Sequence, residues 1–133
     1  MARLYRVILP VSDIEAAATF YAAILGAPGK RVSSGRHYFD CEGTILACYD
    51  SIADGDKHPV PANPEHIYLA VDDLDDAYTR CEAAQAKLAA GALRSGTPLG
   101  AIAKRPWGET SFYLHDPFGN PLCFVARGTM FTG

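Results

Sequence analysis

RPWGETSFYLHDPFGNPLCFV, residues 105–125, contains two runs rich in aromatic and β-branched residues, Thr110–His115 and Pro121–Val125. The DPFGN segment between them places Asp, Pro and Gly at the first, second and fourth positions of a turn. This order suits a type I turn, because proline presets φ and glycine accepts a positive φ. The stretch therefore predicts a β-hairpin. Two strands bury too little surface to offset the entropy of ordering them, so the rest of the chain must supply another layer.

The bulk properties restrict the class of partner. The chain has 133 residues, which is enough to form a hydrophobic core without disulfides or a structural metal. Its 12 Lys+Arg against 15 Asp+Glu give a formal net charge of −3. It has no long basic run, so we expect neither a nucleic-acid nor a membrane partner. No apolar run has the length of a membrane span, and the N-terminus does not resemble a signal peptide. We expect a cytoplasmic protein with a small apolar or aromatic ligand.

The four cysteines have no metal-binding or redox spacing. They lie inside apolar segments rather than in loops, at positions 41, 48, 81 and 123. We expect them to be reduced residues of the core.

The first half of the sequence predicts one helix and four strands. A β-rich run covers Leu4–Pro10, and Ser12 with Glu15 three residues later is typical of a capping box. Apolar residues then recur at spacings of three and four until Gly26. Three short strands follow, at Lys30–Ser33, His37–Cys41 and Thr44–Tyr49.

The second half repeats this order. After a linker rich in Pro and Gly at 53–64, we expect a strand at Glu65–Val71 and a helix capped by Asp72, with an apolar stripe that reaches Leu88. A connector at 91–100, a strand around Ile102–Arg105 and the hairpin complete it. We therefore predict a single domain of two βαβββ modules, about 1–52 and 65–133.

An offset of 60 residues tests this repeat. It superposes Leu9 on Leu69 and Ile14 on Leu74, so the same positions of each half are apolar. Two copies of βαβββ imply that neither half closes a sheet by itself. Each module needs a partner from its own chain or from another.

Three segments resemble the vicinal-oxygen-chelate superfamily, which includes glyoxalases, bleomycin-resistance proteins and extradiol dioxygenases. They are EHIYLAVDD at 65–73, LPVSD at 9–13 with Phe20 and Tyr21, and PWG followed by FYLHDPFGNPLCFV. The resemblance implies an α+β fold in which the curled mixed sheets of paired modules enclose a cavity, and it implies a homodimer. It leaves function open, because the family includes lyases, isomerases, oxygenases and binding proteins.

In metal-using members of that family, the ligands lie on the first and fourth strands of each module. The matching positions here are Arg6, Leu46 or Ala47 (the register is open by one), His66 and Cys123. Only His66 keeps the usual ligand type, since Arg has no lone pair to give and Leu or Ala cannot ligate. We expect no metal and no other cofactor. The alternative is a divalent metal on an unorthodox set that includes His66 and Cys123, with Cys48 if the strand register shifts.

Alternation along the strands places residues on the cavity face. If His66 faces the cavity, so do Tyr68 and Ala70, and on the first strand Arg6 and Ile8 do the same. His66 is then a core histidine, a ligand contact or a general base. Arg6 either pairs with an acidic residue or binds an anionic group of a ligand.

The remaining candidates are aromatic. Trp107, the only tryptophan, either closes the core or lines the pocket, as the resemblance to a PWG segment of drug-binding relatives implies, where its indole would stack on a flat ligand ring. The expected ligand-binding set is Arg6, Ile8, Leu46, His66, Tyr68, Trp107, Phe112 and Cys123. We expect the other histidines, His37, His58 and His115, at the surface or in turns.

The favoured hypothesis is a metal-independent binding protein of the bleomycin-resistance type, which holds a drug or natural product in the cavity. One alternative is a glyoxalase-type lyase or a dioxygenase, in which His66 is the catalytic residue. Another is a structural or regulatory dimer whose cavity is filled.

Overall fold

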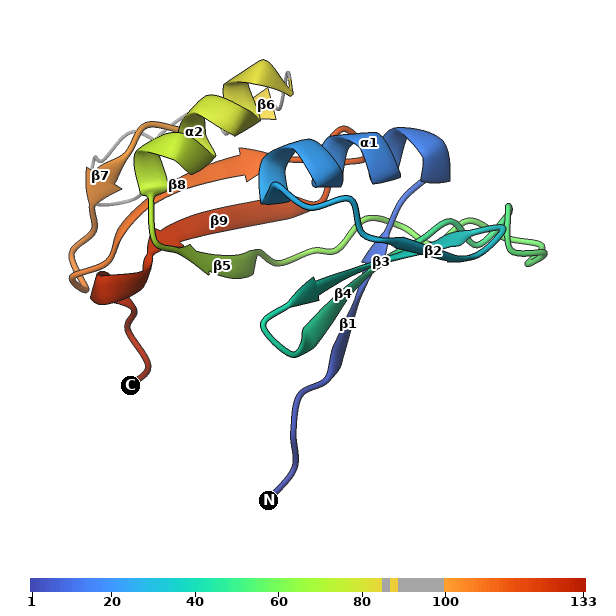
Figure 1. The fold of residues 1–133 in the computed structure, drawn as a ribbon, viewed down its shortest axis with the longest axis horizontal. Coiled ribbons are helices and arrows are strands. Elements are labelled where there is room, and N and C mark those ends of the chain that lie inside the picture. The colour runs from blue at the N-terminus through green and yellow to red at the C-terminus, as the bar shows by residue number, and fades with distance from the viewer. Residues whose placement is uncertain (85–86, 89–99) are drawn as a thin grey trace. The chain divides into compact units, whose positions relative to one another are not determined.

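The computed structural model describes residues 1–84, 87–88 and 100–133, and Figure 1 shows their secondary structure. The chain divides into two compact units, Met1–Asn63 and Pro64–Gly133. Each unit contains one α-helix and one mixed sheet.

Unit 1 is a four-stranded sheet with one helix. Its elements are β1 (Arg6–Pro10), α1 (Ile14–Leu25), β2 (Lys30–Ser33), β3 (Arg36–Cys41) and β4 (Thr44–Tyr49). The strand order is β1-β4-β3-β2, in which β1 and β4 are parallel and the other pairs are antiparallel. The parallel pair is the product of the long crossover through α1, β2 and β3.

Unit 2 repeats this topology. Its elements are β5 (Ile67–Val71), α2 (Leu74–Ala83), β6 (Lys87–Leu88), β7 (Ala103–Lys104), β8 (Thr110–His115), β9 (Pro121–Ala126) and the 3₁₀ turn η1 (Arg127–Thr129). The strand order is β5-β9-β8-β6, with β7 also paired to β8, and β5 and β9 are parallel. The two units confirm the predicted α+β fold of two βαβββ modules.

The N-terminal cap of each helix lies one residue later than predicted. Asp13 caps α1, because its side chain accepts a hydrogen bond from the amide of Ala16 at 3.0 Å, whereas the predicted cap was Ser12. Asp73 caps α2 in the same way through the amide of Asp76 at 2.9 Å, whereas the predicted cap was Asp72. The two true caps are related by the same 60-residue offset as the rest of the repeat.

The helix ends differ in their agreement with the prediction. Gly26 ends α1 in the left-handed conformation (φ +71°), as predicted. By contrast, α2 ends at Ala83, and Leu88 belongs to β6, which pairs with β8. The predicted helix was therefore too long. The predicted connector at 91–100 lies outside the described residues except for Gly100.

Each helix covers one face of its sheet. In unit 1, α1 buries Phe20, Tyr21 and Ile24, and Tyr21 lies against Phe39 of β3. In unit 2, Tyr78 of α2 lies edge-on to Phe112 of β8. All four cysteines are free thiols, and those at 48, 81 and 123 are buried whereas the one at 41 is half-buried.

The β8–β9 turn has the predicted type I hydrogen bond, which Gly119 donates from its amide to the carbonyl of Asp116 at 3.2 Å. The buried Asp116 carboxylate accepts three more hydrogen bonds, from the amides of Phe118 and Asn120 and from the Asn120 side chain. Gly119 has a φ of +90°, which explains the glycine at this position. The Asp116 side chain thus fixes the register of the hairpin.

Neither α-helix in the part of the chain that the structure describes is long and apolar enough to span a bilayer.

Candidate functional site

The unit 2 sheet has one face covered by α2 and one open face. Leu114, Leu122 and Phe124 are fully buried on the covered face together with Phe112. Tyr113, Cys123 and Val125 form a separate buried cluster on the open face. Tyr68 of β5 and Tyr113 of β8 flank Cys123 in the ladder, so these three side chains form one row across the open face.

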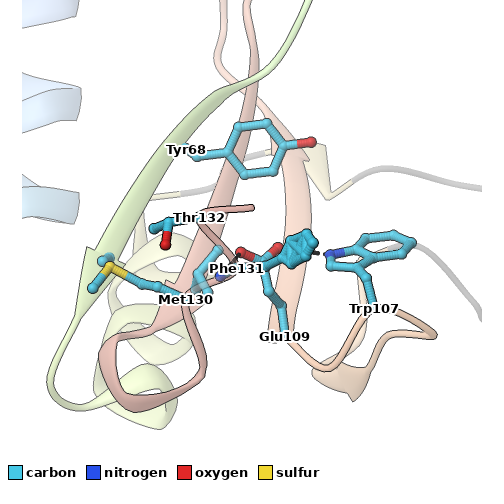
Figure 2. A pocket seen from close by; sticks show the side chains of 8 residues that line it. Tyr68, Trp107, Glu109, Met130, Phe131 and Thr132 are labelled. Carbon is cyan, nitrogen blue, oxygen red and sulfur yellow. Dashed lines mark hydrogen bonds between the residues drawn. The ribbon is translucent and has the colours of Figure 1, made fainter.

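A hollow of about 420 Å³ lies on this open face. The strands contribute Tyr68, Ala70 and Val125, and the loop before β8 contributes Trp107 and Glu109. The C-terminal segment Met130–Thr132 supplies the remaining wall (Figure 2). This volume is in the range of cavities that hold small organic molecules.

Glu109 links the two walls of the hollow. One carboxylate oxygen accepts a hydrogen bond from the indole N–H of Trp107 at 2.8 Å, and the other accepts one from the amide of Phe131 at 3.0 Å (Figure 2). Thr129 ties the same C-terminal segment to the sheet, because its hydroxyl oxygen accepts a hydrogen bond from the amide of Thr110 at 3.0 Å. The carboxylate therefore fixes both the indole and the C-terminal segment around the hollow.

The loop that carries Trp107 is held by a buried arginine. The guanidinium of Arg105 donates to the hydroxyl and carbonyl of Ser111 at 2.9 Å each and to the carbonyl of Ala101 at 3.1 Å, and it lies 4.9 Å from the centre of the Tyr113 ring. Gly108, with a φ of +99°, closes the turn through its amide to the carbonyl of Arg105. Trp107 is thus held on a rigid loop and lines the hollow.

His66 lies beside this hollow. It directly precedes β5, is half-buried, and has its ring 5.0 Å from that of Tyr113 and 6.3 Å from that of Tyr68. Burial lowers the pKa of His66 from its ordinary value of 6.5, and the charge of His115 lowers it further. The imidazole is therefore neutral at pH 7. His115, expected at the surface or in a turn, is the last residue of β8, is half-buried, and acts on His66 electrostatically.

The groups around His66 are weak acids in this environment. Burial raises the pKa of Tyr113 to about 12 and that of Cys123 to about 11. Burial also raises the pKa of Tyr68. At pH 7 and without a metal, the row consists of two phenols and a protonated thiol, and a protonated thiol is a poor nucleophile.

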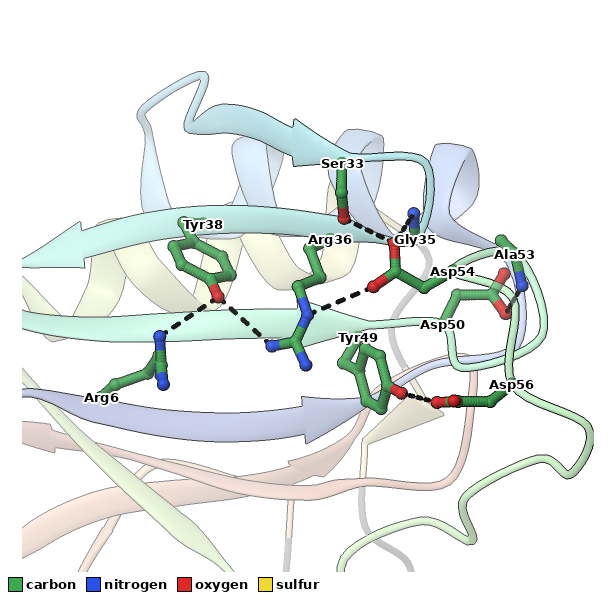
Figure 3. Close-up of polar contacts among 10 residues, drawn as sticks. All are labelled: Arg6, Ser33, Gly35, Arg36, Tyr38, Tyr49, Asp50, Ala53, Asp54 and Asp56. Carbon is green, nitrogen blue, oxygen red and sulfur yellow. Dashed lines mark hydrogen bonds and ion pairs between the residues drawn. The ribbon is translucent and has the colours of Figure 1, made fainter.

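Arg6 and Ile8 belong to unit 1 and lie on the face of its sheet opposite α1. Arg6 donates to the hydroxyl of Tyr38 at 3.5 Å, and Arg36 donates to the same hydroxyl at 3.2 Å (Figure 3). Arg36 also pairs with Asp54 at 3.4 Å. Arg6 has no carboxylate within ion-pair distance among the described residues, so binding of an anionic group by Arg6 stays a prediction.

Two predicted site residues lie on the wrong face. Leu46 pairs in register with Phe39, which packs against α1, whereas Ala47 pairs with Ile8 and Tyr38 on the opposite face. Of the two candidates for the fourth-strand position, Ala47 is therefore the one on the face of Ile8, and Leu46 belongs to the core.

Phe112 was also expected to line the cavity. It is fully buried, stacks on Phe124 with ring centres 5.3 Å apart, and meets Tyr78 of α2 at 5.0 Å. It is therefore a core residue, and Tyr113, its neighbour in sequence, occupies the open face.

The residues at the expected ligand positions do not fit a divalent metal. Arg6 and Ala47 offer no lone pair to a metal, so His66 and Cys123 are the two side chains at these positions that could ligate, fewer than the three protein ligands of a typical site. Across residues 1–84, 87–88 and 100–133, no three His, Cys, Asp or Glu side chains group as a metal site would require. Cys48 is buried in unit 1 and pairs in register with His37.

His37 was expected at the surface or in a turn, but it lies in β3 and is buried. One of its ring nitrogens lies 2.9 Å from the carbonyl of Pro28, and its ring is 5.1 Å from that of Phe39. It therefore belongs to the core of unit 1. His58 lies on the exposed linker, as expected.

Sequence reasoning missed Glu109, Tyr113 and the C-terminal segment Met130–Thr132. Alternation from Cys123 across the ladder could have found Tyr113, because paired residues share a face. No sequence signal indicated that Glu109 would accept from the amide of Phe131, 22 residues away.

Comparison with known proteins identifies the fold. The family model described as Glyoxalase/Bleomycin resistance protein/Dioxygenase superfamily matches residues 3–124. The sequence has no significant match among curated proteins.

Several solved structures are similar along nearly the whole chain. A glyoxalase-related enzyme from Fulvimarina pelagi has a TM-score of 0.74 and 17% identity, and the match covers 100% of this chain and 94% of that one. The oxidase ChaP-H2 has a TM-score of 0.70 and 24% identity, with coverage of 96% and 94%. A lactoylglutathione lyase from Agrobacterium tumefaciens has a TM-score of 0.64 and 22% identity, with coverage of 95% and 94%. By sequence match and by fold, the chain belongs to the glyoxalase/bleomycin resistance protein/dioxygenase superfamily.

Proposed function

We propose that this protein binds a small, largely apolar or aromatic molecule in the hollow on the open face of the unit 2 sheet, without a divalent metal. The proposal corresponds to the drug-binding, bleomycin-resistance type of activity within the superfamily. The observation that carries it is a hollow of about 420 Å³ whose walls are mainly aromatic and aliphatic side chains.

The exposure of the aromatic walls supports ligand binding. Tyr68 is 57% exposed, Trp107 43% and Phe131 53%, although each is a large side chain that gains from burial. Three such side chains around one hollow form the kind of apolar patch that marks binding sites on soluble proteins. A flat ligand ring placed among them would remove this surface from water.

The rigidity of the walls supports the same function. Trp107 is oriented by its hydrogen bond to Glu109, and its loop is anchored by Arg105. A preorganised site loses less entropy on binding than a flexible one.

We propose that the modules pair as a homodimer, which size-exclusion chromatography with light scattering would show as twice the chain mass of 14.3 kDa.

The experiment is a fluorescence titration with 2-naphthylmethanol in a buffer that contains EDTA. Trp107 is the only tryptophan, so its emission reports on this hollow alone. We expect saturable quenching, and Tyr68→Ala should weaken binding about tenfold through the loss of one stacking surface. Tyr5→Ala is the matched control, since Tyr5 is also 57% exposed but lies outside the hollow. Linear, non-saturable quenching by this probe and by charged probes with the same ring system would contradict the proposal.

A catalytic function is the second candidate, and His66 is the observation that favours it. Its lowered pKa leaves a neutral, partly exposed imidazole that can accept a proton at pH 7. Structures with this fold include proteins named as a lyase and as an oxidase. This candidate predicts turnover of a thiohemiacetal or a catechol that His66→Gln abolishes while binding remains. A rate equal to background, with and without added Ni, Mn, Fe or Zn, would eliminate it.

A further inference from the structure

We propose that the hollow selects an organic cation, namely an aromatic molecule whose ammonium or protonated amine group lies beside Glu109. This inference rests on the proposed function, because it names the chemical class of the molecule that the same hollow takes. Two independent observations carry it: the state of the Glu109 carboxylate and the nature of the walls.

The Glu109 carboxylate is buried without a cationic partner. The residue is only 8% exposed, and its two carboxylate oxygens accept hydrogen bonds from neutral donors, the indole of Trp107 and the amide of Phe131. No ion pair within the described part of the chain includes it. Each oxygen keeps a further lone pair, so the carboxylate can still accept from a ligand. A buried carboxylate without a counter-charge is costly, and a bound cation would relieve that cost.

The nearest buried cation does not meet this need. The guanidinium of Arg105 donates to Ser111 and to the carbonyl of Ala101, and its Cζ lies 4.9 Å from the centre of the Tyr113 ring. Only the backbone amide of Arg105 bonds to Glu109, through the carbonyl oxygen of that residue at 2.7 Å. The Glu109 carboxylate therefore lines the hollow without an internal cationic partner among the described residues.

The walls favour the same sign of charge. Tyr68, Trp107 and Phe131 present partly exposed rings, and the faces of aromatic rings attract cations. Glu109 is the only charged side chain among the lining residues that the structure describes. An anionic ligand would lose its hydration next to a carboxylate and three ring faces, so it should be rejected.

The chemistry of the walls also separates an organic cation from a metal ion. Ca²⁺ takes about six to eight oxygen ligands, whereas the side chains here offer one carboxylate, one threonine hydroxyl and one phenol. An alkylammonium or aromatic ammonium ion is weakly hydrated and carries apolar surface. It can therefore use both the rings and the carboxylate.

The test uses three probes with one ring system and different charges. They are trimethyl(2-naphthylmethyl)ammonium, 2-naphthylmethanol and 2-naphthylacetate, each titrated against Trp107 emission in EDTA. We expect the cation to bind at least about tenfold more tightly than the neutral probe, and the anion to bind most weakly. The preference for the cation should shrink between 20 mM and 500 mM salt, because ions screen the attraction.

Glu109→Gln removes the charge at nearly constant size. We expect the ratio of cation affinity to neutral affinity to fall about tenfold in this variant. Glu82→Gln is the matched control, because Glu82 is an exposed carboxylate on α2, on the covered side of the sheet. It should leave the ratio unchanged. If Glu109→Gln fails to fold, the charge series and its salt dependence on the natural protein decide the question.

The outcomes separate the two proposals. Equal binding of the three probes, tighter binding of the anion, or an unchanged ratio in Glu109→Gln would overturn the cation inference and leave the binding function intact. Failure of all three probes to bind saturably would overturn the binding function itself.

Discussion

Replacement of Asp116 by alanine tests whether the β8–β9 turn is organised by one buried carboxylate. The carboxylate accepts hydrogen bonds from the amides of Phe118 and Asn120 at 2.9 and 2.8 Å and from the Asn120 side chain at 2.8 Å. Asn120 is fully buried, so Asp116→Ala removes two hydrogen bonds to a carboxylate, from the amide and the side chain of Asn120, at a place shielded from water.

The magnitude follows from these donors. Each hydrogen bond to a charged group contributes about 1.5–3 kcal/mol, whereas the less buried amide of Phe118 can turn to water. We therefore expect Asp116→Ala to lower the free energy of unfolding by about 3–5 kcal/mol. With a denaturant slope of about 2 kcal/mol/M, the urea midpoint should fall by about 2 M.

Urea unfolding followed by far-ultraviolet circular dichroism measures this change. Asp72→Ala is the control, because Asp72 forms an exposed ion pair with Arg127 at 2.8 Å in the same unit. Exposed pairs contribute less than about 1 kcal/mol. A loss below about 1 kcal/mol for Asp116→Ala, or equal losses for both variants, would refute the account of the turn.

Three further predictions test the burial of individual side chains. Phe112→Ala should cost about 3–5 kcal/mol of stability, whereas Tyr68→Ala should cost under about 1 kcal/mol in the same urea assay. Because the pKa of His66 is lowered on folding, its contribution to stability is present above pH 6.5 and is lost as pH falls through its folded pKa; His66→Gln should flatten this slope. With Ellman's reagent at pH 7.5, Cys123 should react only after unfolding and Cys41 should react first, because the first is fully buried and the second is not.

Alternation and repeat account for most of what the sequence predicts about the fold. β2, β4 and β8 have the predicted bounds, because turn residues flank each of them. The caps were misplaced by one residue, since Ser12 and Asp13 are both good capping residues and only the backbone conformation selects between them. Asp13 has the extended φ and ψ of a cap.

The candidate site was harder to predict, because it depends on strand register and on contacts between distant segments. A shift of one residue moves a side chain to the other face, which explains the error at Leu46. Phe112 was chosen by residue type, although alternation with Tyr113 places only one of the two on the open face. Glu109 and the C-terminal segment meet through tertiary structure, for which a single sequence holds no periodic signal.

The most direct test of the central claim is calorimetric titration of the protein with trimethyl(2-naphthylmethyl)ammonium, first with EDTA and then with added Mg²⁺, Mn²⁺ or Zn²⁺. The account predicts saturable binding of one molecule per hollow, with the same affinity in every buffer. Binding that disappears in EDTA and returns with a divalent ion would contradict it.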